Sequence, residues 1–131
     1  MSHAVPTRSS KPQRSRCPIS TTLEGIGDRW TLVIVRDMVM GKKRFVEFLA
    51  SPERITTNVL TDRLALMEQL GVVQKKPYEK RPLRFEYTLT PKGMGLLPVL
   101  QEMCRWANRH IPGTWIPPKS FMNKRAPARR R

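Results

Sequence analysis

Four short polar side chains near the middle of the chain have the chemistry needed to read the edges of DNA bases. Thr57, Asn58, Thr61 and Asp62 fall on one side of the segment 55–70 if that segment is a helix. Asparagine can form two hydrogen bonds with adenine, threonine can place its methyl group against thymine, and aspartate can accept a hydrogen bond from cytosine. An acidic group beside phosphate is unfavourable, so Asp62 could instead pair with a neighbouring arginine.

Basic side chains on either side of this segment supply candidate phosphate contacts. Lys43 and Arg44 precede it, and Lys80 and Arg81 form the tip of a later turn. For Arg84, a DNA contact and an ion pair along its own strand both remain open. The complete candidate DNA-binding set is Lys43, Arg44, Thr56, Thr57, Asn58, Thr61, Asp62, Arg63, Lys80, Arg81 and Arg84.

The charge of the whole chain also favours a polyanionic partner. The 131 residues include 25 Lys and Arg against 10 Asp and Glu, a net charge of +15. Residues 1–16 hold four basic residues and residues 119–131 hold six, and neither segment has an acidic residue. Basic ends on a mildly basic body suggest nucleic acid, although such tails could also serve solubility alone. We expect disordered basic tails at 1–16 and 116–131 around one domain at 17–115.

Other kinds of chemistry find little support in the sequence. It contains no Ser/His/Asp set, no phosphate-binding loop and no cluster of Cys and His at metal-ligand spacing. We therefore expect no enzyme activity, no metal site and no cofactor. No apolar run reaches the length of about 18 residues that a membrane span needs, so a soluble cytoplasmic protein is expected.

Cys17 is a candidate redox sensor. It stands just before a predicted helix and follows Arg14 and Arg16. A helix N-terminus and nearby cations both favour the reactive thiolate. The alternative is a small apolar residue at a packing junction. Cys104 lies on an apolar helix face, where we expect it in the core.

The segment 55–70 has the pattern of an amphipathic helix that could position the four polar side chains. Leu60, Leu64 and Met67 recur at the spacing of one helical face. Thr56 is a suitable N-cap, because its hydroxyl can accept a hydrogen bond from a free amide of the first turn. The same pattern fits an ordinary surface helix, so the neighbouring elements have to decide between the two interpretations.

The order of the neighbouring elements favours a recognition helix. We predict further helices at 19–26, 29–39, 44–50 and 91–110, and strands at 72–76 and 84–90. The helix at 29–39 is apolar nearly all round and should be buried. The helices at 44–50 and 55–70 make a helix-turn-helix, and the hairpin after them is its wing. The predicted fold is therefore mainly α with a small β-hairpin wing (α+β), a winged helix-turn-helix.

The last predicted helix carries two apolar stripes. One consists of Leu97, Leu100, Cys104 and Ala107, and the other of Leu96, Val99, Met103 and Trp106. Packing on its own domain requires one stripe, so the second indicates burial against a partner subunit. A fully buried terminal helix is the alternative. Pro98 is expected to kink this helix.

Motifs spread over all of these elements match a known family. They are Cys17-Pro18, Gly27-Asp28-Arg29-Trp30-Thr31, Lys43-Arg44-Phe45-Val46-Glu47-Phe48, Ile55-Thr56, Leu60-Thr61, Arg63-Leu64, Leu70-Gly71-Val72-Val73, Arg84-Phe85-Glu86-Tyr87-Thr88-Leu89-Thr90, Leu97-Pro98-Val99-Leu100 and Trp106. Over residues 17–112 the chain resembles the HxlR-type winged helix-turn-helix transcriptional regulators. Thr57 and Asn58 depart from the Gln or Lys that is frequent in the family, so no operator sequence is carried over.

The resemblance implies a homodimeric bacterial regulator that binds double-stranded DNA. Its first and last helices would form the dimer interface, and two recognition helices would enter successive major grooves of a pseudo-palindromic operator. The interface residues expected here are Leu23, Leu96, Val99, Leu100, Met103 and Trp106. Several relatives sense thiol chemistry through a cysteine at the place of Cys17, which implies an oxidant or small-molecule effector.

The expected function is sequence-specific transcriptional regulation by a homodimer. The alternative is an architectural winged-helix protein that binds nucleic acid without sequence preference. The two differ in whether affinity depends on DNA sequence or only on salt.

Overall fold

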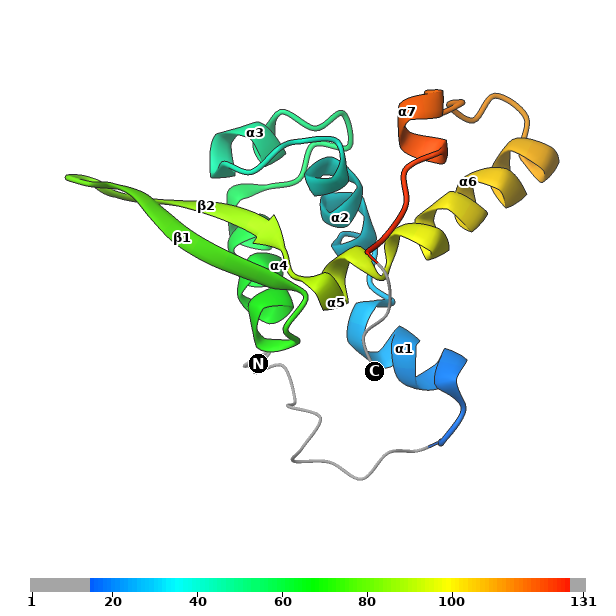
Figure 1. The fold of residues 1–131 in the computed structure, drawn as a ribbon, viewed down its shortest axis with the longest axis horizontal. Coiled ribbons are helices and arrows are strands. Elements are labelled where there is room, and N and C mark those ends of the chain that lie inside the picture. Colours follow the sequence, from blue (N-terminus) through cyan, green and yellow to red (C-terminus); the bar gives the residue numbers. More distant parts are fainter. Residues whose placement is uncertain (1–14, 128–131) are drawn as a thin grey trace.

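The computed structural model describes residues 15–127, which form seven helices and one two-stranded antiparallel sheet (Figure 1). The elements are α1 (Pro18–Ile26), α2 (Thr31–Val39), α3 (Phe45–Leu49), α4 (Thr57–Gln69), β1 (Val73–Lys80), β2 (Leu83–Leu89), α5 (Pro91–Met94), α6 (Leu97–His110) and α7 (Lys119–Met122). The hairpin β1–β2 extends away from the helices, and α1 and α6 lie on the side of the molecule away from it (Figure 1).

Helix α2 lies at the centre of the core. Ile34 and Val35 are almost completely buried, and Met38 and Val39 are also buried. They belong to one hydrophobic cluster with Phe48 of α3 and with residues of α4, β1 and α6. The prediction of a buried central helix is confirmed.

The start of α2 differs from the prediction. Asp28 accepts hydrogen bonds from the amides of Trp30 (2.9 Å) and Thr31 (3.0 Å) and from the Thr31 hydroxyl. Its carboxylate thus satisfies free amides at the entry to the helix, as an N-cap does. Because the chain turns around this carboxylate first, regular helix begins at Thr31 and not at Arg29.

Helix α4 follows its predicted pattern. The Thr56 hydroxyl accepts a hydrogen bond from the amide of Val59 at 3.3 Å, so Thr56 is the N-cap. Leu60, Leu64 and Met67 are buried and hold the helix to the core. The opposite face is left to solvent.

Two glycines make the connections around the hairpin possible. Gly71 ends α4 with φ +78°, a left-handed conformation that glycine adopts without steric cost. Gly93 of α5 packs so closely on the residue before β1 that a Cβ there would lie 2.1 Å from the carbonyl oxygen of Val72. A side chain at Gly93 would therefore push α5 away from the sheet.

The wing hairpin is longer than predicted. Its register runs from Val73 opposite Leu89 to Lys80 opposite Leu83. The sequence predicts a turn from Pro77 onward, but β1 continues through a bulge between Pro77 and Glu79. A two-stranded sheet consists of edge strands only, so a proline without an amide proton is tolerated beside a bulge.

The predicted helix at 91–110 is two helices. Thr90 caps α5 by accepting from the amide of Gly93 at 3.1 Å, and α6 begins after a break at Gly95 and Leu96. The prediction that Pro98 kinks a long helix is wrong. Pro98 lies in the first turn of α6, where its missing amide proton breaks no hydrogen bond.

Part of the predicted disordered C-terminal tail is ordered, and residues 128–131 of that tail lie outside the described residues. Residues 119–122 form α7, and Phe121 is 3% exposed within the core cluster. The Gln101 side-chain amide on α6 donates to the carbonyl oxygens of Phe121 (3.0 Å), Met122 (3.2 Å) and Lys124 (2.8 Å). The prediction failed because one buried aromatic side chain and one amide can fix a segment that is otherwise polar. The predicted N-terminal tail lies, apart from residues 15 and 16, outside the described residues.

The predicted fold class is confirmed: the chain is a winged helix-turn-helix, mainly α with one β-hairpin. Helices α3 and α4 form the helix-turn-helix, and β1 and β2 form the wing. Between residues 15 and 127, none of the helices combines the length and the hydrophobicity needed to cross a bilayer.

Candidate nucleic-acid interface

The polar leading face of α4 is free of the core. Thr57, Asn58, Thr61 and Asp62 are all exposed, while the capping residue Thr56 is exposed at the helix start. The Thr61 hydroxyl donates to the carbonyl oxygen of Thr57 at 2.9 Å, which leaves its methyl group to solvent. The Asn58 amide has no hydrogen-bond partner among residues 15–127, so it can meet an external group. Short side chains of this kind let a helix approach a base edge closely.

Arg63 is engaged inside the domain, although the sequence suggests a phosphate contact. Its Nη1 donates to Asp62 Oδ2 at 2.8 Å, and its Nε lies 3.0 Å from Asp28 Oδ2 in an ion pair without hydrogen-bond alignment. The pairing of Asp62 with a neighbouring arginine is thus confirmed. Burial opposes ionisation of Asp28, but hydrogen bonds from Thr31 and Trp30 and the charge of Arg63 outweigh it and lower the Asp28 pKa.

The turn before α4 is fastened to α2 by Arg36. This guanidinium donates to both carboxylate oxygens of Glu53 (2.7 and 2.9 Å), to Asp37 Oδ1 (3.0 and 2.8 Å) and to the Ser51 hydroxyl (2.9 Å). Ser51 and Asp37 are buried. The hydrogen bonds from Arg36 lower the pKa of Glu53 to about 2. The turn before α4 is therefore held against α2 by several hydrogen bonds.

The base of the wing is tied to the start of α3. Arg44 Nε lies 3.0 Å from Glu86 Oε2, and its guanidinium stacks 3.9 Å from the ring centroid of Tyr78. Lys43 Nζ lies 3.9 Å from Glu86, and the Tyr87 amide donates to the Lys43 carbonyl at 2.7 Å. Both cations are about half exposed, so these contacts orient them without hiding their charge.

The tip of the wing carries positive charge that is not paired within the described residues. Lys80 and Arg81 are exposed and have no ion-pair partner in residues 15–127. Arg84 Nε lies 3.5 Å from Glu79 Oε1 with both side chains about half exposed. An ion pair is therefore present, but it crosses the hairpin to β1 and does not run along β2 as expected. Exposed pairs of this kind contribute little to stability, and Arg84 can still exchange Glu79 for phosphate.

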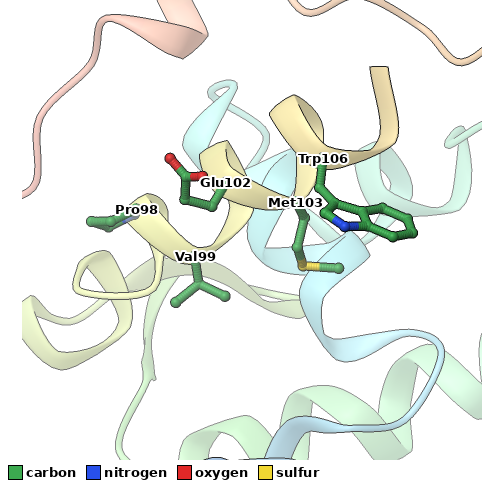
Figure 2. Close-up of a pocket in the computed structure, with 5 residues that line it drawn as sticks. All are labelled: Pro98, Val99, Glu102, Met103 and Trp106. Atoms are coloured by element: carbon green, nitrogen blue, oxygen red, sulfur yellow. The ribbon is translucent and has the colours of Figure 1, made fainter. Parts of the chain in front are cut away.

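A second exposed surface is apolar and lies on α6. Pro98, Val99, Glu102, Met103 and Trp106 line an open pocket on one face of this helix (Figure 2). Leu23 and Ile19 on α1 are also exposed. A set of large apolar side chains exposed on helices of a small domain is typical of an interaction surface.

The six predicted dimer-interface residues divide between this surface and the core. Leu23, Val99, Met103 and Trp106 are 44–60% exposed. Leu96 is half-buried and packs against the core. The prediction for Leu100 is wrong, because it is 7% exposed and lies within the core of its own domain. Leu100 belongs to the same stripe as the buried Leu97, whereas Val99, Met103 and Trp106 of the other stripe are exposed, and their role in a dimer stays a prediction.

The two cysteines have different surroundings. Cys17 is an exposed free thiol at the N-cap position of α1, and its amide donates to the Ser15 hydroxyl at 3.0 Å. Cys104 is half-buried beside the core, where burial raises the pKa of its thiol. The packing-junction alternative for Cys17 does not fit an exposed side chain. Cys104, which was expected in the core, is only partly buried and packs against the core cluster from outside.

The sequence did not indicate the residues that hold the candidate nucleic-acid interface in place. These are Asp28, Arg36, Glu53, Tyr78 and Glu86. Their partners lie up to 42 residues away along the chain, so no local spacing indicates the pairs. A feature of the sequence that does indicate such a contact is the break between α3 and α4, because it contains two residues, Ser51 and Glu53, that accept hydrogen bonds.

A family model described as HxlR-like helix-turn-helix matches residues 25–114. A curated relative, the uncharacterised HTH-type transcriptional regulator YdeP of Bacillus subtilis (strain 168), is 37% identical over 94 residues. The match covers 72% of this chain and 73% of YdeP.

Two solved structures of redox-related regulators are also similar. The redox regulator HypR in its oxidised form is 36% identical with a TM-score of 0.65, over 72% of this chain and 97% of HypR. The reduced form of the transcriptional regulator YodB from B. subtilis is 31% identical with a TM-score of 0.62, over 77% of this chain and all of YodB. The chain therefore shares the fold of these regulators over about three quarters of its length.

Proposed function

The chain belongs to the HxlR-like helix-turn-helix family of transcriptional regulators, and we propose that it binds a pseudo-palindromic operator as a homodimer. The observation that carries this proposal is the exposed leading face of α4, with Thr57, Asn58 and Thr61, on a helix held to the core from behind. Base contacts then specify sequence, while phosphate contacts fix position.

In this proposal the cations around α4 bind the DNA backbone. Lys80 and Arg81 reach it from the wing tip, and Lys43 and Arg44 reach it from the start of α3. Arg63 instead supports α4 through Asp28. Backbone contacts of this kind provide most of the non-specific affinity.

The homodimer would form through the apolar faces of α1 and α6. Val99, Met103 and Trp106 expose large side chains around an open pocket (Figure 2). Leu23 exposes a fourth on α1. A second copy of the same surface is the self-complementary partner that two-fold symmetry requires. Two α4 helices would then read half-sites about one helical turn apart.

Oxidation of Cys17 is the proposed effector input. Its thiol is exposed at the start of α1, next to the proposed dimer surface, and HypR is described as a redox regulator. A thiol-specific oxidant such as diamide should therefore change DNA affinity in the wild type and not in Cys17→Ser. An effect that survives the substitution removes this role.

The proposal is tested by selecting bound duplexes from a random DNA pool. We expect an inverted repeat whose half-sites lie on one face of the double helix. A pool without any enriched motif, bound with strong salt dependence, would instead support the architectural protein. The basic residues at both ends of the chain make that the second candidate.

A further inference from the structure

Arg54 has an unusual backbone conformation. Its φ is +62°, and no other non-glycine residue between 15 and 127 has a positive φ. The left-handed region is unfavourable for any residue with a Cβ, and glycine adopts it freely. Strain of this kind persists where the surrounding structure imposes it and is common at functional positions.

The residues on both sides of Arg54 impose this conformation. The Arg54 amide donates to the Ser51 carbonyl at 3.0 Å. Ser51 and Glu53 are held by Arg36 on α2, and Ile55 is 6% exposed in the core. The backbone is held on both sides of Arg54, so the change of chain direction between Glu53 and Ile55 falls on Arg54.

The charge of Arg54 is free, unlike that of the other arginines near α4. Arg36, Arg44 and Arg63 each form an ion pair. Arg54 is exposed and has no ion-pair partner in the described part of the chain. Its guanidinium is therefore available to an external anion.

The position of Arg54 defines which anion it can meet. It lies two residues before Thr56, the N-cap of α4, and Thr57 and Asn58 follow on the exposed first turn. When the first turn of a recognition helix enters a major groove, the residues just before it lie at the groove edge, beside the phosphates. A guanidinium can bind two phosphate oxygens at once.

We propose that Arg54 is a phosphate contact that fixes the N-terminal end of α4 on the DNA backbone, and that the strained turn serves to present it. This rests on the proposed function, because it requires α4 to enter the groove. The proposal adds a phosphate contact from the turn before α4 to the phosphate contacts expected from the wing.

Arg54→Gly removes the backbone strain and the guanidinium together, and the two losses appear in different measurements, the first in stability and the second in DNA binding. We expect a higher Tm than the wild type, and weaker binding to the selected operator and to random DNA by a similar factor. The slope of log K against log salt should fall by about one unit. Arg54→Lys keeps the charge and should keep the wild-type slope. Lys119→Ala removes an exposed charge on α7, which lies beyond α2 as seen from α4 (Figure 1), and should change neither affinity nor slope.

The outcomes distinguish this proposal from the proposed function. If the wild type enriches an operator but Arg54→Gly binds it with unchanged affinity and slope, the phosphate contact is wrong and operator recognition stands. If the wild type enriches no sequence, operator recognition fails, while a lower slope for Arg54→Gly on random DNA still supports the contact. An equal loss of slope in Lys119→Ala would show a bulk charge effect and overturn the assignment to Arg54.

Discussion

Arg63 Nε on α4 lies 3.0 Å from Asp28 Oδ2 at the entry to α2. The same carboxylate accepts the amides of Trp30 and Thr31. One aspartate therefore caps the central helix and holds the recognition helix, directly after α1. Asp28 therefore links the α1–α2 junction directly to α4.

Asp28→Ala should destabilise the domain more than Asp28→Asn. Alanine removes the cap and the ion pair, and loss of a cap alone costs about 1 kcal/mol. Asparagine keeps the hydrogen-bond acceptor and loses the ion pair, which contributes about 0.5 kcal/mol at a partly exposed site. Urea unfolding of both variants measures the difference. Equal destabilisation would show that the charge, and not the cap, is the main contribution of Asp28.

Local chemistry in the sequence was sufficient to predict the elements of the helix-turn-helix. The N-cap Thr56, the buried face with Leu60 and Leu64, and the turn at Gly71 are formed by residues near one another along the chain. For this reason both the helix-turn-helix and the exposed polar face of α4 could be predicted.

Contacts between distant residues were not predictable in the same way. The Arg44–Glu86 pair spans 42 residues, and Gln101 binds carbonyl groups 20 to 23 residues later. Hydrophobic periodicity says which face of a helix is buried, but not which element covers it. The ordered C-terminal segment and the internal role of Arg63 therefore needed the structure.

Acid should destabilise the domain partly through Glu53. Its folded pKa of about 2 is below its ordinary value of 4.5, because Arg36 hydrogen-bonds its ionised form. The stabilisation is complete above the ordinary pKa and is lost as the pH falls from 4.5 towards 2. Glu53→Gln should be less stable than the wild type near neutral pH, and the gap in free energy of unfolding should narrow below about pH 4.5 and close only at about pH 2 or below. A gap that is constant with pH would mean that the charge of Glu53 contributes nothing.

Removal of the C-terminal anchor should destabilise the whole domain. Phe121 is 3% exposed in the core cluster, and truncation of a buried phenylalanine costs roughly 3 kcal/mol. Gln101→Leu should cost about 1–2 kcal/mol, since it removes the donor to three carbonyl groups. Both are measured as shifts of the urea midpoint, with Lys119→Ala on the exposed side of α7 as the control. If Phe121→Ala matched that control, the segment would not be part of the folded domain.

Trp106 and Met103 provide a test of the proposed dimer. They are 59% and 51% exposed on the apolar face of α6, so substitution should spare the fold. Trp106→Ala should raise the dimer Kd by about 30-fold or more, as for a central aromatic residue worth about 2 kcal/mol, and Met103→Glu should do so by adding charge. Analytical ultracentrifugation measures the association, and Arg109→Ala on the same helix serves as the control. A dimer unaffected by both substitutions would place the interface elsewhere.

Asn58 and the wing tip should affect DNA binding in different ways. Asn58 is exposed on the first turn of α4 without a partner in residues 15–127, so Asn58→Ala should weaken binding to the selected operator by about 1–3 kcal/mol and leave random DNA almost unaffected. Replacing Lys80 and Arg81 with Ala should weaken both equally and lower the salt slope by about two units. Fluorescence anisotropy over a series of salt concentrations measures both effects. Asn58→Ala should change the ratio of the operator affinity to the random-DNA affinity. The wing-tip variant should lower both affinities and leave their ratio unchanged, so the measurement distinguishes base recognition from a backbone contact. An equal loss for Asn58→Ala on both DNAs would contradict base recognition by Asn58, and an unchanged slope for the wing variant would contradict its contact with the backbone.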